Sequence, residues 1–244
     1  MRVLVVADVH ANLAAFESVL AHAETRGPID VIWALGDLVG YGPEPGACLE
    51  LLRRYPHVAV AGNHDRAAGG QIGTEDFNAY AAAAVRWTAS VLTSEEAAYL
   101  KALPDAETIG DFTLVHGSLR DPTWEYVISS EAASGHLERQ TTPYGLIGHS
   151  HLQLTFVEFG PDRVRGSLMG DGDVLELADH RVVANPGGLG QPRDGDPRTC
   201  YALLDTDARR LSFHRIEYDI ARTQRKMRLA GLPEYLIERL ARGR

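Results

Sequence analysis

The chain has 244 residues, of which 45% are hydrophobic, and a formal net charge of −9 at neutral pH. Its acidic balance argues against stable nucleic-acid binding, because that binding needs Lys and Arg to neutralise phosphates, and no apolar run approaches the length of a membrane span. We expect one domain over residues 1–244. The sequence has no basic leader before its first apolar stretch, and its only thiols are Cys48 and Cys200, which we expect to be buried and inert. The protein is therefore predicted to be cytoplasmic.

The first quarter of the chain alternates strand-like and helical patterns. Asn12 is suited to cap the first helix, which should run to about Gly27. The predicted elements in order are a strand over 2–7, this helix, a strand over 30–37, a helix over 44–55, and a strand over 57–65 that ends in a polar turn. This βαβαβ order predicts parallel strands joined by right-handed crossovers.

Residues 74–103 have a helical pattern, with Thr93 and Glu96 spaced as a capping box. We expect this segment to be a helical insertion above the sheet. Strands are then predicted over 111–118, 144–151 and 154–160, followed by shorter strands to about Ile216, a Pro/Gly-rich loop over 185–198 and two final helices. The second half is expected to be mostly antiparallel, and the whole an α/β fold.

Polar residues able to bind metal gather where the predicted strands stop. They are Asp8, His10, Asp37, Asn63, His64, Asp65, His116, His149 and His151. The carboxyl ends of strands line the crevice of an open α/β sheet, so these side chains are predicted to form one site. Imidazole, carboxylate and amide groups without a thiolate favour Mn²⁺, Fe²⁺, Co²⁺, Ni²⁺ or Zn²⁺ over Ca²⁺ and Mg²⁺.

The order of these blocks resembles the calcineurin-like metallophosphoesterase superfamily, with its DxH, GDxxxxG, GNH[D/E], single H and GHxH motifs, and its small bacterial and archaeal phosphodiesterases in particular. The resemblance implies a four-layer α/β/β/α sandwich of two mixed sheets. It also implies a first metal on Asp8, His10 and His151, and a second on Asn63, His116 and His149, with Asp37 bridging both. In the family, the residue matching His64 does not bind metal but donates a proton or a hydrogen bond to the substrate, and the one matching Asp65 orients it.

Two divalent ions, with Mn²⁺ foremost, then imply hydrolysis of a phosphate ester by a hydroxide that bridges them. Ions roughly 3.5 to 4 Å apart lower the pKa of a shared water and stabilise both the entering and the leaving oxygen. We expect a small phosphodiester as substrate. The candidates to contact it are the basic residues Arg66, Arg120 and Arg193 and the aromatic residues Trp124 and Tyr126.

Several alternatives stay open. The same ligands would serve a phosphomonoesterase or a nucleotide pyrophosphatase that cleaves dinucleoside polyphosphates. A phosphoprotein phosphatase is disfavoured, because GDLVGYG lacks the arginine of the GDxVDRG block found in those enzymes. A non-catalytic scaffold resembling the retromer subunit is disfavoured by the presence of His64, and a DNA-end-processing nuclease by the short acidic chain. Neither the physiological ester nor the oligomeric state follows from the sequence.

Overall fold

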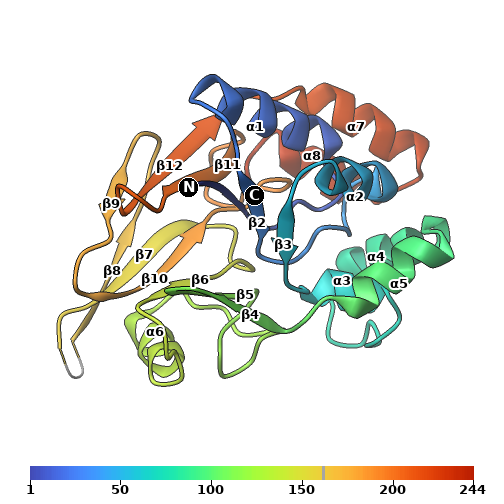
Figure 1. The fold of residues 1–244 in the computed structure, drawn as a ribbon. Coiled ribbons are helices and arrows are strands. Elements are labelled where there is room, and N and C mark those ends of the chain that lie inside the picture. Colours follow the sequence, from blue (N-terminus) through green and yellow to red (C-terminus); the bar gives the residue numbers. More distant parts are fainter. Residues whose placement is uncertain (161–162) are drawn as a thin grey trace.

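The computed structural model describes residues 1–160 and 163–244, which form two six-stranded sheets lying face to face (Figure 1). The first sheet has the order β3 (His57–Ala59), β2 (Val31–Ala34), β1 (Arg2–Val6), β11 (Thr199–Asp205), β12 (Arg210–Ile216) and β9 (Val174–Glu176). The second has the order β4 (Ala106–Ile109), β5 (Phe112–Val115), β6 (Tyr144–Leu146), β10 (Arg181–Pro186), β7 (Gln153–Glu158) and β8 (Val164–Leu168).

Strand direction follows the sequence pattern. β1, β2 and β3 are parallel, as the βαβαβ order predicts, and β1 pairs antiparallel with β11. In the second sheet β5, β6 and β10 are parallel, whereas β4, β7 and β8 are added antiparallel. The carboxyl ends of the parallel strands in both sheets therefore face the same end of the molecule.

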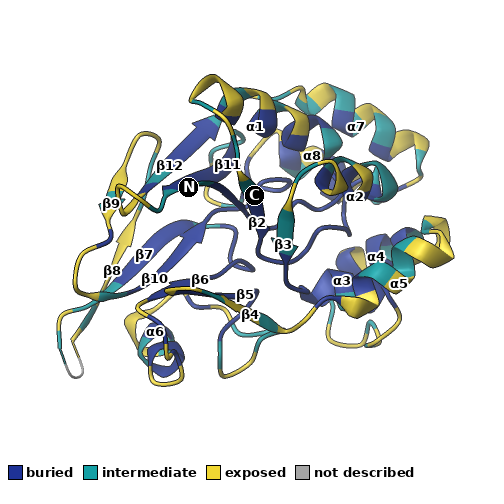
Figure 2. Cartoon of the chain, viewed as in Figure 1, coloured by how far each residue is buried: buried dark blue, intermediate teal, exposed yellow. Residues whose placement is uncertain are grey.

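Helices cover the outer faces of the sheets and complete the four-layer sandwich. α1 (Leu13–Thr25), α2 (Pro45–Arg53), α7 (Ile220–Leu229) and α8 (Glu234–Leu240) lie on the side of the first sheet, and α6 (Ser130–Leu137) packs against β8 and β10 of the second. Asn12 caps α1 through a hydrogen bond from the amide of Ala15. Figure 2 shows the buried residues concentrated in the strands between these layers.

The inner faces of the two sheets share one apolar core. Val5 of β1, Trp33 of β2 and Phe213 of β12 meet Leu114 of β5 and Ala184 of β10 there. A second cluster, which includes Phe16 of α1 and Leu49 of α2, fills the space between the first sheet and its helices. Both sheets are held by this shared core, so the strand ends that carry polar residues are fixed relative to one another.

The helical insertion consists of α4 (Ala79–Val91) and α5 (Ser94–Ala102), and Thr93 and Glu96 form the predicted capping box. The insertion lies beside β3 and packs α4 against α7 and α8, not above a sheet. The third predicted strand is shorter than expected. β3 ends at Ala59, and the residues of the predicted polar turn start a helix, α3 (Asn63–Ala68), whose N-terminus Asp65 caps.

Two short elements, α6 and β4, had not been predicted. Cys48 and Cys200 are buried free thiols, as expected, and burial raises the pKa of both. Across the described ranges, the helices are all too short or too polar to span a lipid bilayer.

Candidate metal centre

Each predicted ligand lies just beyond an element that fixes its position. Asp8 and His10 follow β1, Asp37 follows β2, His116 directly follows β5, and His149 and His151 follow β6, while Asn63 and His64 begin α3. All of these side chains are buried, with at most 4% of their surface exposed. Residues separated by up to 143 positions are therefore brought to one place by the parallel strands of the two sheets.

Five of these residues have a left-handed backbone. Asp8, His10, Asp37, His149 and His151 have φ values between +46° and +65°. For residues other than glycine this conformation is uncommon, costs about 1 to 2 kcal/mol, and concentrates at functional sites. This conformation turns the backbone sharply at the end of each strand, so that alternate side chains point into the same space.

The first group of candidate ligands consists of Asp8, His10 and His151. The Nδ1 atoms of His10 and His151 donate to the carbonyl oxygens of Val39 (3.1 Å) and Gln191 (2.6 Å). Both Nε2 atoms then carry lone pairs, and they face each other at 3.2 Å. Asp8 Oδ1 lies 3.4 Å from His151 Nε2, and Asp8 Oδ2 has no hydrogen-bond partner in the described chain. Lone pairs this close repel unless a cation lies among them, so these atoms fit a metal.

The second group has the same construction. His116 Nδ1 donates to the carbonyl of Leu35 (2.8 Å), and His149 Nε2 donates to that of Trp124 (3.1 Å). The free lone pairs, on His116 Nε2 and His149 Nδ1, are 3.1 Å apart, and Asn63 Oδ1 lies 3.3 Å from His116 Nε2. Backbone carbonyls thus fix the tautomer of all four histidines and leave the nitrogen that faces the centre free to bind.

Asp37 lies between the two groups. Its Oδ2 atom is 3.6 Å from His10 Nε2 and 3.5 Å from His116 Nε2, and its Oδ1 accepts a hydrogen bond from the amide of His64 at 2.9 Å. No other carboxylate among the described residues lies within 4.0 Å of histidine ring nitrogens of both groups. The position is the one that the bridging role requires.

The electrostatics of the cluster also suit cations. Burial lowers the pKa of His116 to about 4 and that of His149 to about 2, so both rings are neutral near pH 7, as ligands must be. Burial raises the pKa of Asp37 to about 7, and burial together with Asp37 raises that of Asp8 well above its usual value. Positive charge placed among these carboxyl groups would restore their ionised form.

His64 differs from the four ligand histidines. Its Nδ1 atom is buried without a hydrogen-bond partner in the described chain, so no carbonyl fixes its tautomer. The ring lies 4.9 Å from that of His10 and 5.0 Å from that of Phe77, measured between ring centroids, and it lines a cavity beside Asp37. A ring nitrogen of His64 lies within 4.8 Å of ligand atoms of His10 and Asp37, but its ring lacks the carbonyl contact of the four other histidines and lines the cavity.

The expectation that Asp65 orients His64 is not supported. The carboxylate of Asp65 accepts hydrogen bonds from the backbone amides of Gly62 and Val39, both at 3.1 Å. As the N3 residue of α3 it satisfies the amide at the helix N-terminus, and it joins this helix to the loop after β2. Asp65 therefore positions the backbone on which Asn63 and His64 stand.

The three predicted arginines have different surroundings. Arg193 lines the cavity with Trp124 and Tyr126, and its guanidinium donates to Gln191 Oε1 at 3.0 Å. Arg66 is paired with Asp105, and Arg120 with Glu125, and neither lines the cavity. A nearby surface carboxylate holds Arg66 and Arg120 outside this cavity, and their contact with a substrate stays a prediction.

The cavity wall also contains residues that had not been predicted, among them Tyr41 and Phe77. The ring of Tyr41 lies 4.3 Å from that of His64, and Arg193 lies 5.6 Å above the Tyr41 ring. Phe77, from the segment before α4, contacts both His64 and Trp124. Tyr41 belongs to the GDLVGYG block and could have been found there, whereas nothing in the sequence around Phe77 signals its position.

Comparison with known proteins agrees with this geometry. Residues 1–209 match the family model described as the calcineurin-like phosphoesterase superfamily domain. An uncharacterized protein of Methanocaldococcus jannaschii is 34% identical over 250 residues, which cover 99% of this chain and 98% of that protein.

Solved structures extend the likeness. A metallophosphoesterase from Sphaerobacter thermophilus has 46% sequence identity and a TM-score of 0.91, with 100% of this chain and 99% of that chain covered. A hypothetical protein from Pyrococcus horikoshii shares the fold at 19% identity and a TM-score of 0.82, with 100% and 98% covered. The chain belongs to the calcineurin-like phosphoesterase superfamily, a family of metal-dependent hydrolases.

Proposed function

We propose that the protein is a phosphodiesterase that depends on two divalent metal ions. The observation that carries the proposal is the pair of ligand groups that share Asp37 beside a cavity containing both His64 and Arg193. Asp8, His10 and His151 would hold one ion, and Asn63, His116 and His149 the other. Mn²⁺ is the first choice by ligand chemistry, with Fe²⁺, Co²⁺, Ni²⁺ and Zn²⁺ also compatible.

When bound, such ions would activate a water molecule and neutralise charge on the phosphate. The side chains of the protein supply what remains. Arg193 has no carboxylate partner among the described residues, so its guanidinium is available to a phosphate oxygen. In this role it holds the ester so that the bond to be broken points toward His64.

His64 is proposed as the general acid. A departing alkoxide is a strong base and needs a proton, which a positioned imidazole can donate. Because no backbone group binds His64 Nδ1, the ring is free to carry a proton on either nitrogen. Its contacts with Tyr41 and Phe77 hold the ring plane, while its edge faces the cavity.

The shape and charge of the cavity favour a diester. Its volume is about 80 Å³, which accommodates a phosphate group, so the organic groups of the ester must extend past Tyr126, whose surface is 47% exposed. Asp76 also lines the cavity. Its negative charge disfavours a monoester, which near neutral pH carries roughly one negative charge more than a diester.

The test is a comparison of substrates with the purified protein supplemented with Mn²⁺. We expect bis(4-nitrophenyl) phosphate to be hydrolysed with at least tenfold higher kcat/KM than 4-nitrophenyl phosphate. Diadenosine tetraphosphate tests the pyrophosphatase alternative in the same assay. Asp37→Asn is the control for contaminating activity. Faster hydrolysis of the monoester or of the tetraphosphate would overturn the diester assignment, and no turnover of any ester would favour a scaffold.

A further inference from the structure

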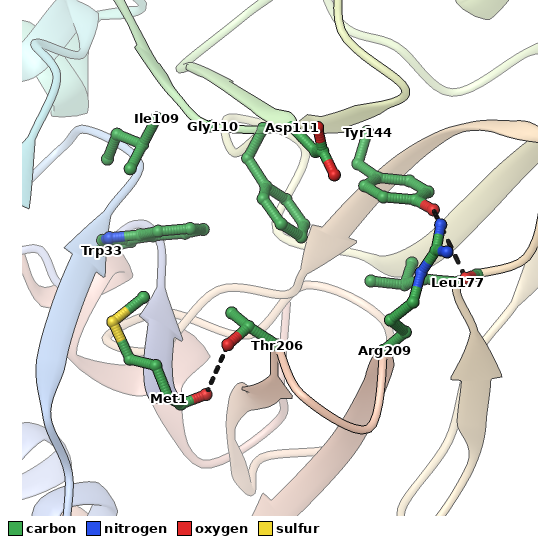
Figure 3. A pocket seen from close by; sticks show the side chains of 10 residues that line it. Met1, Trp33, Ile109, Gly110, Asp111, Tyr144, Leu177, Thr206 and Arg209 are labelled. Carbon is green, nitrogen blue, oxygen red and sulfur yellow. Dashed lines mark hydrogen bonds between the residues drawn. The ribbon is translucent and has the colours of Figure 1, made fainter.

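A second cavity lies between the two sheets at the end opposite the metal ligands. Its volume is about 350 Å³, and its wall includes the start of β5, the start of β6 and the turn between β11 and β12 (Figure 3). The cavity opens to solvent at the edge of the sheets, so a small molecule can reach it. Its volume and mainly apolar wall are those of a site for a small molecule.

Three aromatic side chains line this inter-sheet cavity, with the ring of Phe112 in contact with those of the other two. The rings of Trp33 and Phe112 are 5.2 Å apart, and those of Phe112 and Tyr144 are 5.1 Å apart, measured between centroids. Figure 3 shows Trp33 and Tyr144 on opposite sides of the cavity, with Leu177 and Ile109 also on its wall. Aromatic rings in such a row offer faces and edges to a flat apolar group.

Arg209 provides a positive charge at the mouth, near the acidic residues Asp111 and Asp179. The Arg209 guanidinium donates to the Tyr144 hydroxyl and lies 5.9 Å from the Tyr144 ring centroid (Figure 3). Its backbone has φ +52°, a conformation that is uncommon for arginine. Asp111 also lines the cavity, yet no carboxylate in the described part of the chain forms an ion pair with Arg209. A fixed guanidinium with unused donors, next to an apolar wall, is complementary to one carboxylate on an aromatic body.

The three aromatic residues stand on strands that lead to candidate metal ligands. Trp33 lies on β2, which leads to Asp37; Phe112 begins β5, which leads to His116. Tyr144 begins β6, which leads to His149 and His151. A molecule bound among the three rings would therefore contact three of the strands that position the metal cluster.

We propose that this inter-sheet cavity is a second binding site, separate from the metal centre, for a small aromatic carboxylate. The ring system lies against Trp33, Phe112 and Tyr144, and the carboxylate binds the guanidinium of Arg209. Because the cavity is at the far end of the sheets, its ligand does not compete with the phosphate ester.

The three tryptophans of the chain provide the readout. Trp33 lines the inter-sheet cavity, Trp124 lines the metal cavity, and Trp87 packs in the cluster between α4 and the C-terminal helices. Protein labelled with 5-fluorotryptophan and loaded with Zn²⁺ should give three fluorine signals, each assigned by a Trp→Phe variant. Titration with 2-naphthoate should shift the Trp33 signal saturably and leave the Trp87 signal in place.

The matched probe is 2-naphthamide, which keeps the rings and removes the charge. It should bind about tenfold more weakly, which is the size expected for losing one charge-assisted hydrogen bond. Arg209→Gln should weaken naphthoate binding by a similar factor, and Arg209→Lys by less. Arg210→Gln, next in the chain and paired with Glu176, should leave the affinity unchanged.

Several outcomes would overturn the proposal. They are equal affinities for naphthoate and naphthamide, an unchanged affinity in Arg209→Gln, and a naphthoate-induced shift of the Trp124 signal with none of Trp33. The amide comparison uses the unmodified protein, so it decides the question even if an Arg209 variant fails to fold.

Discussion

Gly40 offers a way to displace His64 without altering any metal ligand. It has φ +87°, and a Cβ atom added there would lie 2.8 Å from His64 Cγ and 2.9 Å from His64 Cβ. These atoms are at the root of the side chain, so the collision cannot be relieved by a change at a flexible end. In Gly40→Ala the imidazole must move away from the cavity.

The expected cost has two parts. Alanine at positive φ costs about 1 to 2 kcal/mol, and forcing an extra carbon into a packed site costs about 1 to 3 kcal/mol. The sum, about 2 to 5 kcal/mol, should lower Tm by several degrees, since each kcal/mol shifts Tm by about 2 to 4 °C at this chain length. Loss of a positioned general acid should slow hydrolysis of an alkyl phosphodiester by about 10² or more.

Gly70→Ala is the matched control. Gly70 has φ +75°, and a Cβ atom there would have no neighbour within 4 Å, so only the backbone cost applies. The assay measures Tm, bound metal and the rate on an alkyl phosphodiester for both variants. Both should bind as much metal as the unmodified protein, and only Gly40→Ala should be slow. A Gly40→Ala protein that keeps the full rate would refute the role assigned to His64.

Three further predictions follow from single side chains. His64→Gln should keep its metal and lose much more rate on an alkyl phosphodiester than on a nitrophenyl one, because nitrophenolate leaves without a proton; equal losses with loss of metal would make His64 a ligand. Arg193→Gln should lower kcat/KM for the diester by about 10- to 100-fold, whereas Arg66→Gln, outside the cavity, should not. Burial lowers the pKa of His136 to about 4, so the unfolded chain binds its proton first and stability is lost as pH falls from about 6.5 to 4. Urea unfolding at pH 7.5 and pH 5 measures this loss. Between these pH values the unfolding free energy of the unmodified protein should fall by about 2 kcal/mol more than that of His136→Gln. An equal fall in the two proteins would contradict the pKa shift.

The sequence was most informative where chemistry coincides with the end of a strand. Asp8, Asp37 and His116 follow apolar runs, and the rule that parallel strands share one binding edge brought them together in the prediction. The helix caps at Asn12 and Thr93 were readable because capping depends on neighbouring residues only.

Features that depend on distant contacts were not readable. Nothing local indicates that Asp105 binds Arg66, that Glu125 binds Arg120, or that Asp65 accepts amides from two loops. The left-handed backbone at the ligands is likewise set by packing between sheets. The same reason hides the inter-sheet cavity, because its aromatic wall comes from three strands far apart in the chain.

The central claim is that Asp37 joins two metal sites into one centre. Direct measurement of bound metal, with Mn²⁺ or Zn²⁺ in excess and then removed by gel filtration, tests it. The unmodified protein should retain two ions per chain and His149→Ala about one. In Asp37→Asn both metal sites should be only partly occupied. Two fully bound ions in Asp37→Asn, or a single ion in the unmodified protein, would contradict the account.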